Sequence, residues 1–313
     1  MKILAVSPHL HSGETTPVLM RAVLLALTPA LLAALIFFGW RAVWLTATCV
    51  GAAVLTEYLA ALFFRKGNYL NDLSSVVTGL LLAFVLPPSL PLWMAALGAV
   101  FAILIVKELF GGLGHNIFNP ALSGRAFLLA SFPIIMTNWT APFDALTTAT
   151  PLALAKSGQL LDAVTSATLQ TGVAEQTANY WSLFLGNVAG SLGETSALAL
   201  LLGAAYLLCR KIIDWRIPLG YLGTVALFMF LAGEDVAFHL LAGGLLLGAF
   251  FMATDYTTSP MARRGKWIFA IGCGILTSVI RLWGGYPEGV CYSILIMNMF
   301  VPLIDRLDEA KNK

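Results

Sequence analysis

The feature that most constrains this chain is a series of long apolar runs separated by short polar or basic links. A run that lies in lipid must satisfy its own backbone N–H and C=O groups, and a helix of about 20 residues does so across a bilayer. The sequence therefore predicts an all-α, polytopic membrane protein with about ten transmembrane helices. The expected spans are residues 20–39, 42–64, 73–87, 92–110, 117–137, 194–209, 216–233, 236–254, 266–284 and 288–305.

The composition agrees with lipid as the main surrounding. Of the 313 residues, 59% are hydrophobic and 11% are charged, whereas a soluble domain carries roughly a quarter charged residues. The net charge of +2 does not favour nucleic acid as a partner, since basic residues occur in short clusters between apolar runs. Membrane lipid is the expected contact.

The spans form two groups of five, and a long polar segment lies between them. Residues 78–84 are similar to residues 243–250, and residues 109–112 are similar to residues 282–285. Five helices per group would place the two repeats in opposite orientations, as in many transporters. The expected parts are an N-terminal arm 1–19, a first five-helix repeat 20–137, a loop 138–193, a second five-helix repeat 194–305 and a tail 306–313.

The charge distribution indicates an orientation. Basic clusters are expected on the cytoplasmic side of a membrane protein. If both termini are cytoplasmic, four clusters lie inside, and the opposite loops hold mainly acids, with Arg41 and Lys156 as exceptions. The loop 138–193 then faces outward. The clusters are Arg65 with Lys66; Arg210, Lys211 and Arg216; Arg263, Arg264 and Lys266; Arg306 with Lys311.

Two irregular stretches indicate a site inside the bundle. The Pro-rich residues 87–91 end a short span, and the Gly- and Asn-rich residues 111–120 are too irregular to contact lipid. Irregular backbone is tolerated at membrane depth where it is buried in protein or lines a cavity. The alternatives are a broken helix beside a central site and a plain short loop.

Metal-binding patterns are weak. Four cysteines occur singly among apolar neighbours, which favours small buried residues over iron–sulfur or zinc ligands. His9 and His11 lack carboxylate or thiolate partners and form a poor metal site. No metal is expected.

The sharpest local signal is the run Asp-Ala-Leu-Thr-Thr-Ala-Thr-Pro-Leu at residues 144–152. This run resembles a family that contains the D subunit of the Rnf complex and the B subunit of the sodium-pumping NADH:quinone reductase. Shorter matches extend over nearly the whole chain, at residues 7–9, 119–122, 131–133, 193–196, 214–218, 253–255, 280–289 and 301–305.

The resemblance implies a covalent flavin. In that family a threonine at the position of Thr150 is esterified to the phosphate of FMN. The resemblance also implies a separate flavin transferase, which would use FAD and a metal to activate the attack of the hydroxyl on phosphorus. Thr148 replaces a residue that is often small, and we include it among the flavin-binding candidates. A second, similar run at residues 162–168 leaves Thr168 as an alternative.

Ionisable residues inside apolar spans are functional candidates because a charge in lipid is costly. Arg125 could hold the flavin phosphate, or a buried carboxylate such as Glu57 or Glu108. Lys107 could extend toward the interface or pair. Glu194 and Arg281 lie near the expected outward face, where they could bind the flavin; capping and interface roles are the alternative.

The function implied by the resemblance is electron transfer within a ferredoxin:NAD oxidoreductase complex that moves Na⁺ or H⁺. The implied partners are the Rnf subunits A, B, C, E and G. A second, non-covalent flavin such as riboflavin is implied for some members. The chain has no nicotinamide fingerprint, so partners would handle ferredoxin and NAD. Alternatives are a quinone-reducing relative and a solute channel or transporter without a redox role.

Overall fold

The computed structural model describes residues 15–64, 72–143, 147–156 and 180–311. Several predictions concern residues outside these ranges, namely those on His9, His11, Arg65, Lys66, Asp144 and Thr168. The described chain is built from helices, with one short pair of strands. The overall class predicted from the apolar runs, an all-α membrane protein, is confirmed.

The first half of the bundle comprises residues 15–136. Its helices are α1 (Thr16–Phe38), α2 (Trp40–Phe63), α3 (Ser74–Phe84), α4 (Leu92–Val100), α5 (Pro120–Ser131) and α6 (Pro133–Met136). Helix α4 continues directly into the π-helix η2 (Phe101–Glu108). Within the expected span 117–137, the helix is interrupted at Phe132, where ψ is 57° and Pro133 follows.

The second half comprises residues 197–311. Its elements are α10 (Ala197–Cys209), α11 (Arg216–Ala232), α12 (Val236–Leu241), α13 (Leu245–Leu247), the π-helix η3 (Gly248–Met252), α14 (Arg263–Trp283) and α15 (Val290–Lys311). The expected span 236–254 is therefore not one continuous helix. It is broken at residues 242–244, where Ala242 is extended and Gly243 has a φ of 72°.

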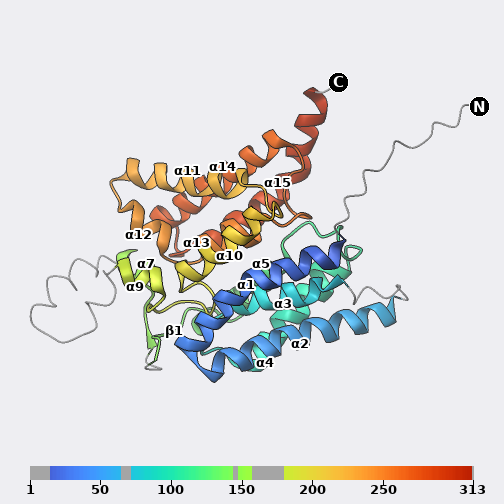
Figure 1. The fold of residues 1–313 in the computed structure, drawn as a ribbon, viewed down its shortest axis with the longest axis horizontal. Helices are drawn as coiled ribbons and strands as arrows, with labels where there is room; N and C mark the ends of the chain where they lie inside the picture. Colours follow the sequence, from blue (N-terminus) through green and yellow to red (C-terminus); the bar gives the residue numbers. More distant parts are fainter. Residues whose placement is uncertain (1–14, 65–71, 144–146, 157–179, 312–313) are drawn as a thin grey trace, which may run out of the picture.

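Small elements lie between the halves. The strands β1 (Trp139–Thr140) and β2 (Thr147–Thr148) pair antiparallel, with Trp139 opposite Thr148. They are followed by the short helices α7 (Pro151–Lys156) and α9 (Tyr180–Leu185). In Figure 1 these elements gather at the left end of the bundle, while the last turns of α15 lie at the upper right.

Four helices are each long and apolar enough to cross a membrane, namely α1, α2, α14 and residues 290–307 of α15. Helices α3, α10 and α11 are apolar but shorter. Capping side chains set the start of two helices. Asn119 and Ser196 cap α5 and α10 by accepting the backbone N–H of Leu122 and Ala199, respectively.

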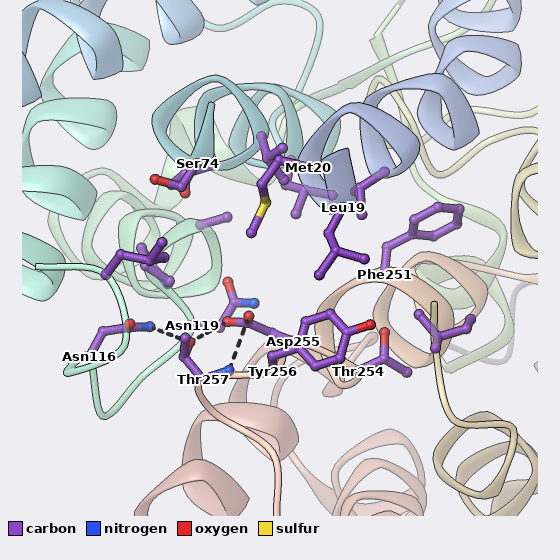
Figure 2. Close-up of a pocket in the computed structure, with 18 of the residues that line it drawn as sticks. Leu19, Met20, Ser74, Asn116, Asn119, Phe251, Thr254, Asp255, Tyr256 and Thr257 are labelled. Atoms are coloured by element: carbon purple, nitrogen blue, oxygen red, sulfur yellow. Dashed lines mark hydrogen bonds between the residues drawn. The ribbon is translucent and has the colours of Figure 1, made fainter. Parts of the chain in front are cut away.

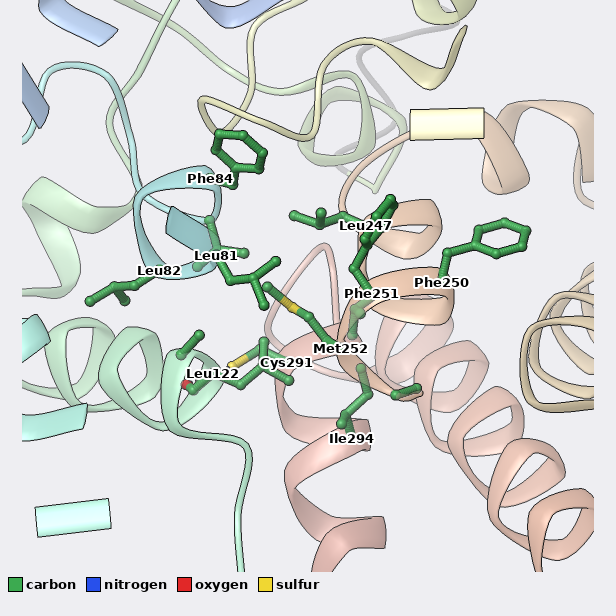
Figure 3. Close-up of a cluster of buried hydrophobic side chains, with 14 of the residues drawn as sticks. Leu81, Leu82, Phe84, Leu122, Leu247, Phe250, Phe251, Met252, Cys291 and Ile294 are labelled. Atoms are coloured by element: carbon green, nitrogen blue, oxygen red, sulfur yellow. Dashed lines mark hydrogen bonds between the residues drawn. The ribbon is translucent and has the colours of Figure 1, made fainter. Parts of the chain in front are cut away.

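Close helix contacts join the two halves. Helix α1 packs on α10, and a methyl carbon added to Gly203 of α10 would lie 2.0 Å from the carbonyl oxygen of Ala26. Small residues at such crossings let two backbones approach, which is the main means of tight packing between helices in lipid. At the centre, Leu81 and Phe84 of α3 face Phe251 and Met252 of η3 (Figure 3).

The segment before α10 also links the halves through its backbone. The N–H groups of Leu192 and Gly193 donate to the carbonyl oxygens of Leu86 and Phe84, at 3.1 and 2.9 Å. These acceptors lie at the end of α3, where the last carbonyls of a helix lack partners of their own. The link therefore completes the end of α3.

The prediction that the cysteines are buried is correct for three of them. Cys49, Cys273 and Cys291 are buried, whereas Cys209 is exposed at the end of α10. Within the described residues, no group of three or more His, Cys, Asp or Glu side chains is arranged to hold a metal ion.

Candidate functional site

Thr150 lies at the junction between β2 and α7. Its side-chain oxygen accepts the backbone N–H of Ala153 at 3.2 Å, and Pro151 occupies the first position of the helix. This is the arrangement that favours the start of a helix, with a hydroxyl cap followed by proline. Thr150 is only 7% exposed, so the loop 138–193 brings its hydroxyl into the protein.

A cavity lies on each side of Thr150. The larger has a volume of about 850 Å³ including its open mouth, and it extends from Thr150 to Arg125 and Glu288. Aromatic and sulfur-containing side chains form much of its wall, namely Met136, Trp139, Tyr286 and Tyr292. The smaller cavity, of about 350 Å³, extends from Thr150 to Glu194 and Gly243.

A buried charge cluster connects the two cavities. Arg125 of α5 forms ion pairs with Glu194 at 3.3 Å and with Glu288. The guanidinium also donates to the carbonyl oxygen of Val85. Burying a charge is costly unless it is paired and hydrogen-bonded, and these partners compensate Arg125.

The cluster retains hydrogen-bonding capacity. The Nε atom of Arg125 and the Oε2 atom of Glu194 are buried and have no partner among the described residues. Such unsatisfied atoms are rare in folded proteins and indicate an additional ligand, water or ion. A donor and an acceptor are thus available beside the cavities that contain Thr150.

Arg281 and Lys156 hold the surrounding backbone. Arg281 donates to the carbonyl oxygens of Glu288 and Ala242, both at 3.2 Å, and of His239. It therefore fixes the break between α12 and α13 and the turn that carries Glu288. Lys156, at the end of α7, donates to the carbonyl oxygens of Ile280 and Tyr286, both at 3.0 Å. Burial lowers the pKa of the Lys156 amine.

A second contact fixes α9 at the same end of the bundle. The Tyr180 hydroxyl donates to Asp235, which also caps α12 through the backbone N–H of Phe238. The hydrogen bond with Asp235 raises the pKa of Tyr180, and it lowers the pKa of Asp235.

The structure brings together only some of the site residues predicted from the sequence. Thr150, Arg125 and Glu194 come together, whereas Arg281 reaches the cluster only through the backbone of Glu288. Thr148 lies on β2 and lines neither cavity. Glu288 was not identified as a site residue. Its sequence signal was the irregular Gly-Gly-Tyr-Pro-Glu-Gly turn at residues 284–289.

The expected pairing of Arg125 with a buried carboxylate is confirmed, but its partners are Glu194 and Glu288, so Glu57 and Glu108 were the wrong candidates. Glu57 instead pairs with Lys107 in the first half of the bundle, and the Lys107 amine also donates to Ser74 at 2.5 Å. Lys107 is buried, so it pairs and does not extend toward an interface. The compensated charges explain how these residues are accommodated between apolar helices.

A further pocket lies near this pair (Figure 2). Its volume is about 800 Å³ including the open part, and Leu19, Met20 and Phe251 form apolar walls. Opposite Ser74 is a polar row, in which Asn116 donates to Thr257 and Thr257 donates to Asp255, both at 3.0 Å. The irregular link 111–120 thus lines a cavity, as the sequence indicated.

The helices and the buried charge cluster define a polytopic, all-α membrane protein with interhelical cavities. Comparison with known families gives a match to the NQR2, RnfD, RnfE family over residues 3–313. The chain belongs to this family, and the resemblance inferred from the motifs is confirmed.

Several relatives match nearly the whole chain. The D subunit of the Na⁺-translocating ferredoxin:NAD⁺ oxidoreductase complex of Acetobacterium woodii is 49% identical over 307 residues, which is 97% of this chain and 93% of the relative. The proton-translocating counterpart of Clostridium ljungdahlii is 46% identical, with 97% and 93% covered. The D subunit of the ion-translocating oxidoreductase complex of Stutzerimonas stutzeri is 44% identical, with 92% and 89% covered.

Proposed function

We propose that this chain is the D subunit of an ion-translocating ferredoxin:NAD oxidoreductase complex and carries FMN covalently on Thr150. The observation that carries the proposal is the position of Thr150 between two cavities that share Glu288. A solute channel would have no reason to keep the threonine motif at residues 144–152. Family membership gives the class of complex, and the names of the relatives give the reaction.

The residues around Thr150 fit a flavin phosphoester. Trp139, Tyr286 and Tyr292 offer flat apolar surfaces for a fused ring, as small-molecule sites usually do. The free Nε–H of Arg125 is a charged donor for a phosphate oxygen. Bound there, the flavin would supply a redox group that accepts and donates electrons.

The protein's own residues would orient that group and exclude water. Arg281 fixes the turn that carries Tyr286 and Glu288, and the buried Glu194 balances part of the positive charge. Thr148, in contrast, contributes through strand pairing with Trp139, and we propose it only as a support for this wall.

We also propose the pocket of Figure 2 for a second, non-covalent flavin such as riboflavin. Its apolar walls and the polar row from Asn116 to Asp255 are the combination that orients a flat heterocycle. The contact of this pocket with both halves of the bundle supports a role in the electron path, since α1, α3 and η3 all line it.

Ten membrane-spanning segments in two inverted five-helix repeats are the architecture that we propose. Corresponding contacts support it. The first helices of the two halves, α1 and α10, pack on each other, and so do α5 and α15, which belong to the fifth span of each half. The contact of α2 with α4 in the first half corresponds to the contact of α11 with α14 in the second. The proposed repeats are 20–137 and 194–305, with the arm 1–19 and the tail 306–313 cytoplasmic and the loop 138–193 outside the cell membrane.

The proposed partners follow from the reaction. The described residues hold no group of three or more metal-ligating side chains, and the sequence has no nicotinamide fingerprint; we therefore propose that the Rnf subunits A, B, C, E and G handle ferredoxin, NAD and the remaining relays. A flavin transferase would attach FMN during maturation. One alternative is a quinone-reducing relative with the same architecture. The subunits that co-purify with this chain would distinguish that complex from a ferredoxin:NAD oxidoreductase.

The test is covalent flavin fluorescence of the denatured protein, produced in its own host. Thr150→Ala should lose the covalent flavin, whereas Thr148→Ala and Thr168→Ala should keep it. The flavin released on denaturation reports the second, non-covalent site and should persist in Thr150→Ala. Wild-type protein without covalent fluorescence, or loss in Thr168→Ala alone, would contradict the assignment to Thr150.

A further inference from the structure

Thr150 is not accessible to another enzyme while α7 is in its observed position. Thr150 as a residue is buried, and its side-chain oxygen already accepts the backbone N–H of Ala153. To form the phosphoester, Oγ1 must approach the phosphorus of FAD to about 3–3.5 Å in line with the leaving group. Thr150 lines a cavity of about 350 Å³ and an open one of about 850 Å³, and neither is large enough to admit both FAD and the enzyme that holds it.

Among the described residues, the contacts that hold α7 are few and lie outside the main core. Leu152 of α7 packs in a small apolar cluster with Leu183 of α9 and with Phe238 and Ala242. At the other end of the helix, Lys156 donates to the carbonyl oxygens of Ile280 and Tyr286. Elements with few buried apolar contacts open at low free energy, without unfolding of the rest of the protein.

The Lys156 contacts join α7, which follows Thr150, to the end of α14 and the turn after it. Ile280 lies in the last turn of α14, where a positive charge is favoured by the helix dipole. Tyr286 lines the larger cavity and lies two residues before Glu288. Docking of Lys156 therefore brings Thr150 against the turn that carries Tyr286 and Glu288.

We propose that Lys156 is a positioning residue that closes the flavin site after attachment: FMN is transferred while α7 is undocked, and the Lys156 contacts then hold the modified Thr150 inside the protein. This inference rests on the proposed attachment at Thr150. In the transfer, the Thr150 Oγ1–P bond forms, the P–O–P bond of FAD breaks, AMP leaves, and a base of the transferase takes the hydroxyl proton.

The test is the initial rate of covalent flavin incorporation into purified, flavin-free protein, with FAD, a divalent cation and the host's flavin transferase. Lys156→Met should raise this rate about two- to fivefold, the range expected for one partly exposed charged contact. Lys156→Arg keeps the charge and the donors and should restore the wild-type rate.

A second variant undocks α7 without changing the sequence around Thr150. Leu183→Ala removes a buried side chain from the apolar cluster and should also raise the rate. Leu27→Ala, a fully buried leucine of α1, is the matched control for a general loss of stability and should leave the rate unchanged.

A readout after attachment separates positioning from folding. Iodide should quench the attached flavin more strongly in Lys156→Met than in wild type or Lys156→Arg, because α7 closes the site less often. Equal incorporation rates in wild type, Lys156→Met and Leu183→Ala would overturn the proposal while leaving the attachment site intact. No covalent flavin in any protein would overturn the proposed function together with it.

Discussion

Replacing Gly203 by alanine tests whether the contact of α1 with α10 holds the two halves together. The added methyl carbon would lie 2.0 Å from the carbonyl oxygen of Ala26, whereas real contacts of this kind are not shorter than 3.0 Å. The obstacle is backbone, which cannot rotate away as a side chain can. The two helices must therefore separate by about 1 Å, and inserting atoms into a packed interface typically costs about 1–3 kcal/mol.

Gly223→Ala in α11 is the matched control. Nothing lies within 4 Å of a methyl carbon at Gly223, and both changes gain the same helix preference of alanine over glycine, about 0.5–1 kcal/mol. That gain cancels in the comparison. The difference between the two variants should equal the packing cost, about 1–3 kcal/mol in favour of Gly223→Ala.

The assay is reversible unfolding in detergent micelles, followed by helical circular dichroism. Gly203→Ala should unfold at a lower denaturant concentration than Gly223→Ala. If the two variants unfold at the same midpoint, the reasoning is refuted, because α1 and α10 then do not approach as closely as the structure has them.

Two other predictions concern paired side chains. Lys107→Met should destabilise the fold by about 3–5 kcal/mol, because it leaves the buried Glu57 carboxylate unpaired; Lys107→Met with Glu57→Gln should recover most of the loss in the same unfolding assay, and a double variant as unstable as the single one would argue against the pair. Tyr180 should titrate above the usual pKa of about 10, because its hydrogen bond to Asp235 favours the protonated phenol. The contact therefore persists below that pKa and is lost as pH rises through it, or as pH falls through the lowered pKa of Asp235. The tyrosinate absorbance that wild type has and Tyr180→Phe lacks measures this pKa, and Asp235→Asn should lower it; an unchanged midpoint would exclude the pairing in solution.

The sequence was sufficient to predict the elements whose signal is local. Helices α1, α2, α14 and α15 follow from apolar runs of adequate length, whereas the assignment of FMN to Thr150 comes from the family resemblance and stays a prediction. The helix breaks were less predictable. Pro133 is visible in the sequence, but the break at residues 242–244 depends on carbonyl groups that Arg281 satisfies from another helix.

The partners of buried charges could not be predicted because they are distant in the chain. Arg125 and Glu288 are separated by 163 positions, and Lys107 and Glu57 by 50. Every charge inside a span needs a partner, but the sequence does not say which acid lies opposite which base. Glu57 and Glu108 were the expected carboxylate partners of Arg125, and the arrangement of the helices instead brings Glu194 and Glu288 to it.

The completion of α3 by Leu192 and Gly193 has a consequence for biosynthesis. At roughly 5–20 residues per second, the chain between Leu86 and Leu192 takes roughly 5–20 s to emerge from the ribosome. During that time the carbonyl oxygens of Phe84 and Leu86 lack the N–H groups that later satisfy them. The first half therefore lacks these two hydrogen bonds while it is made, and a chain truncated before Leu192 would leave this helix end open to other partners.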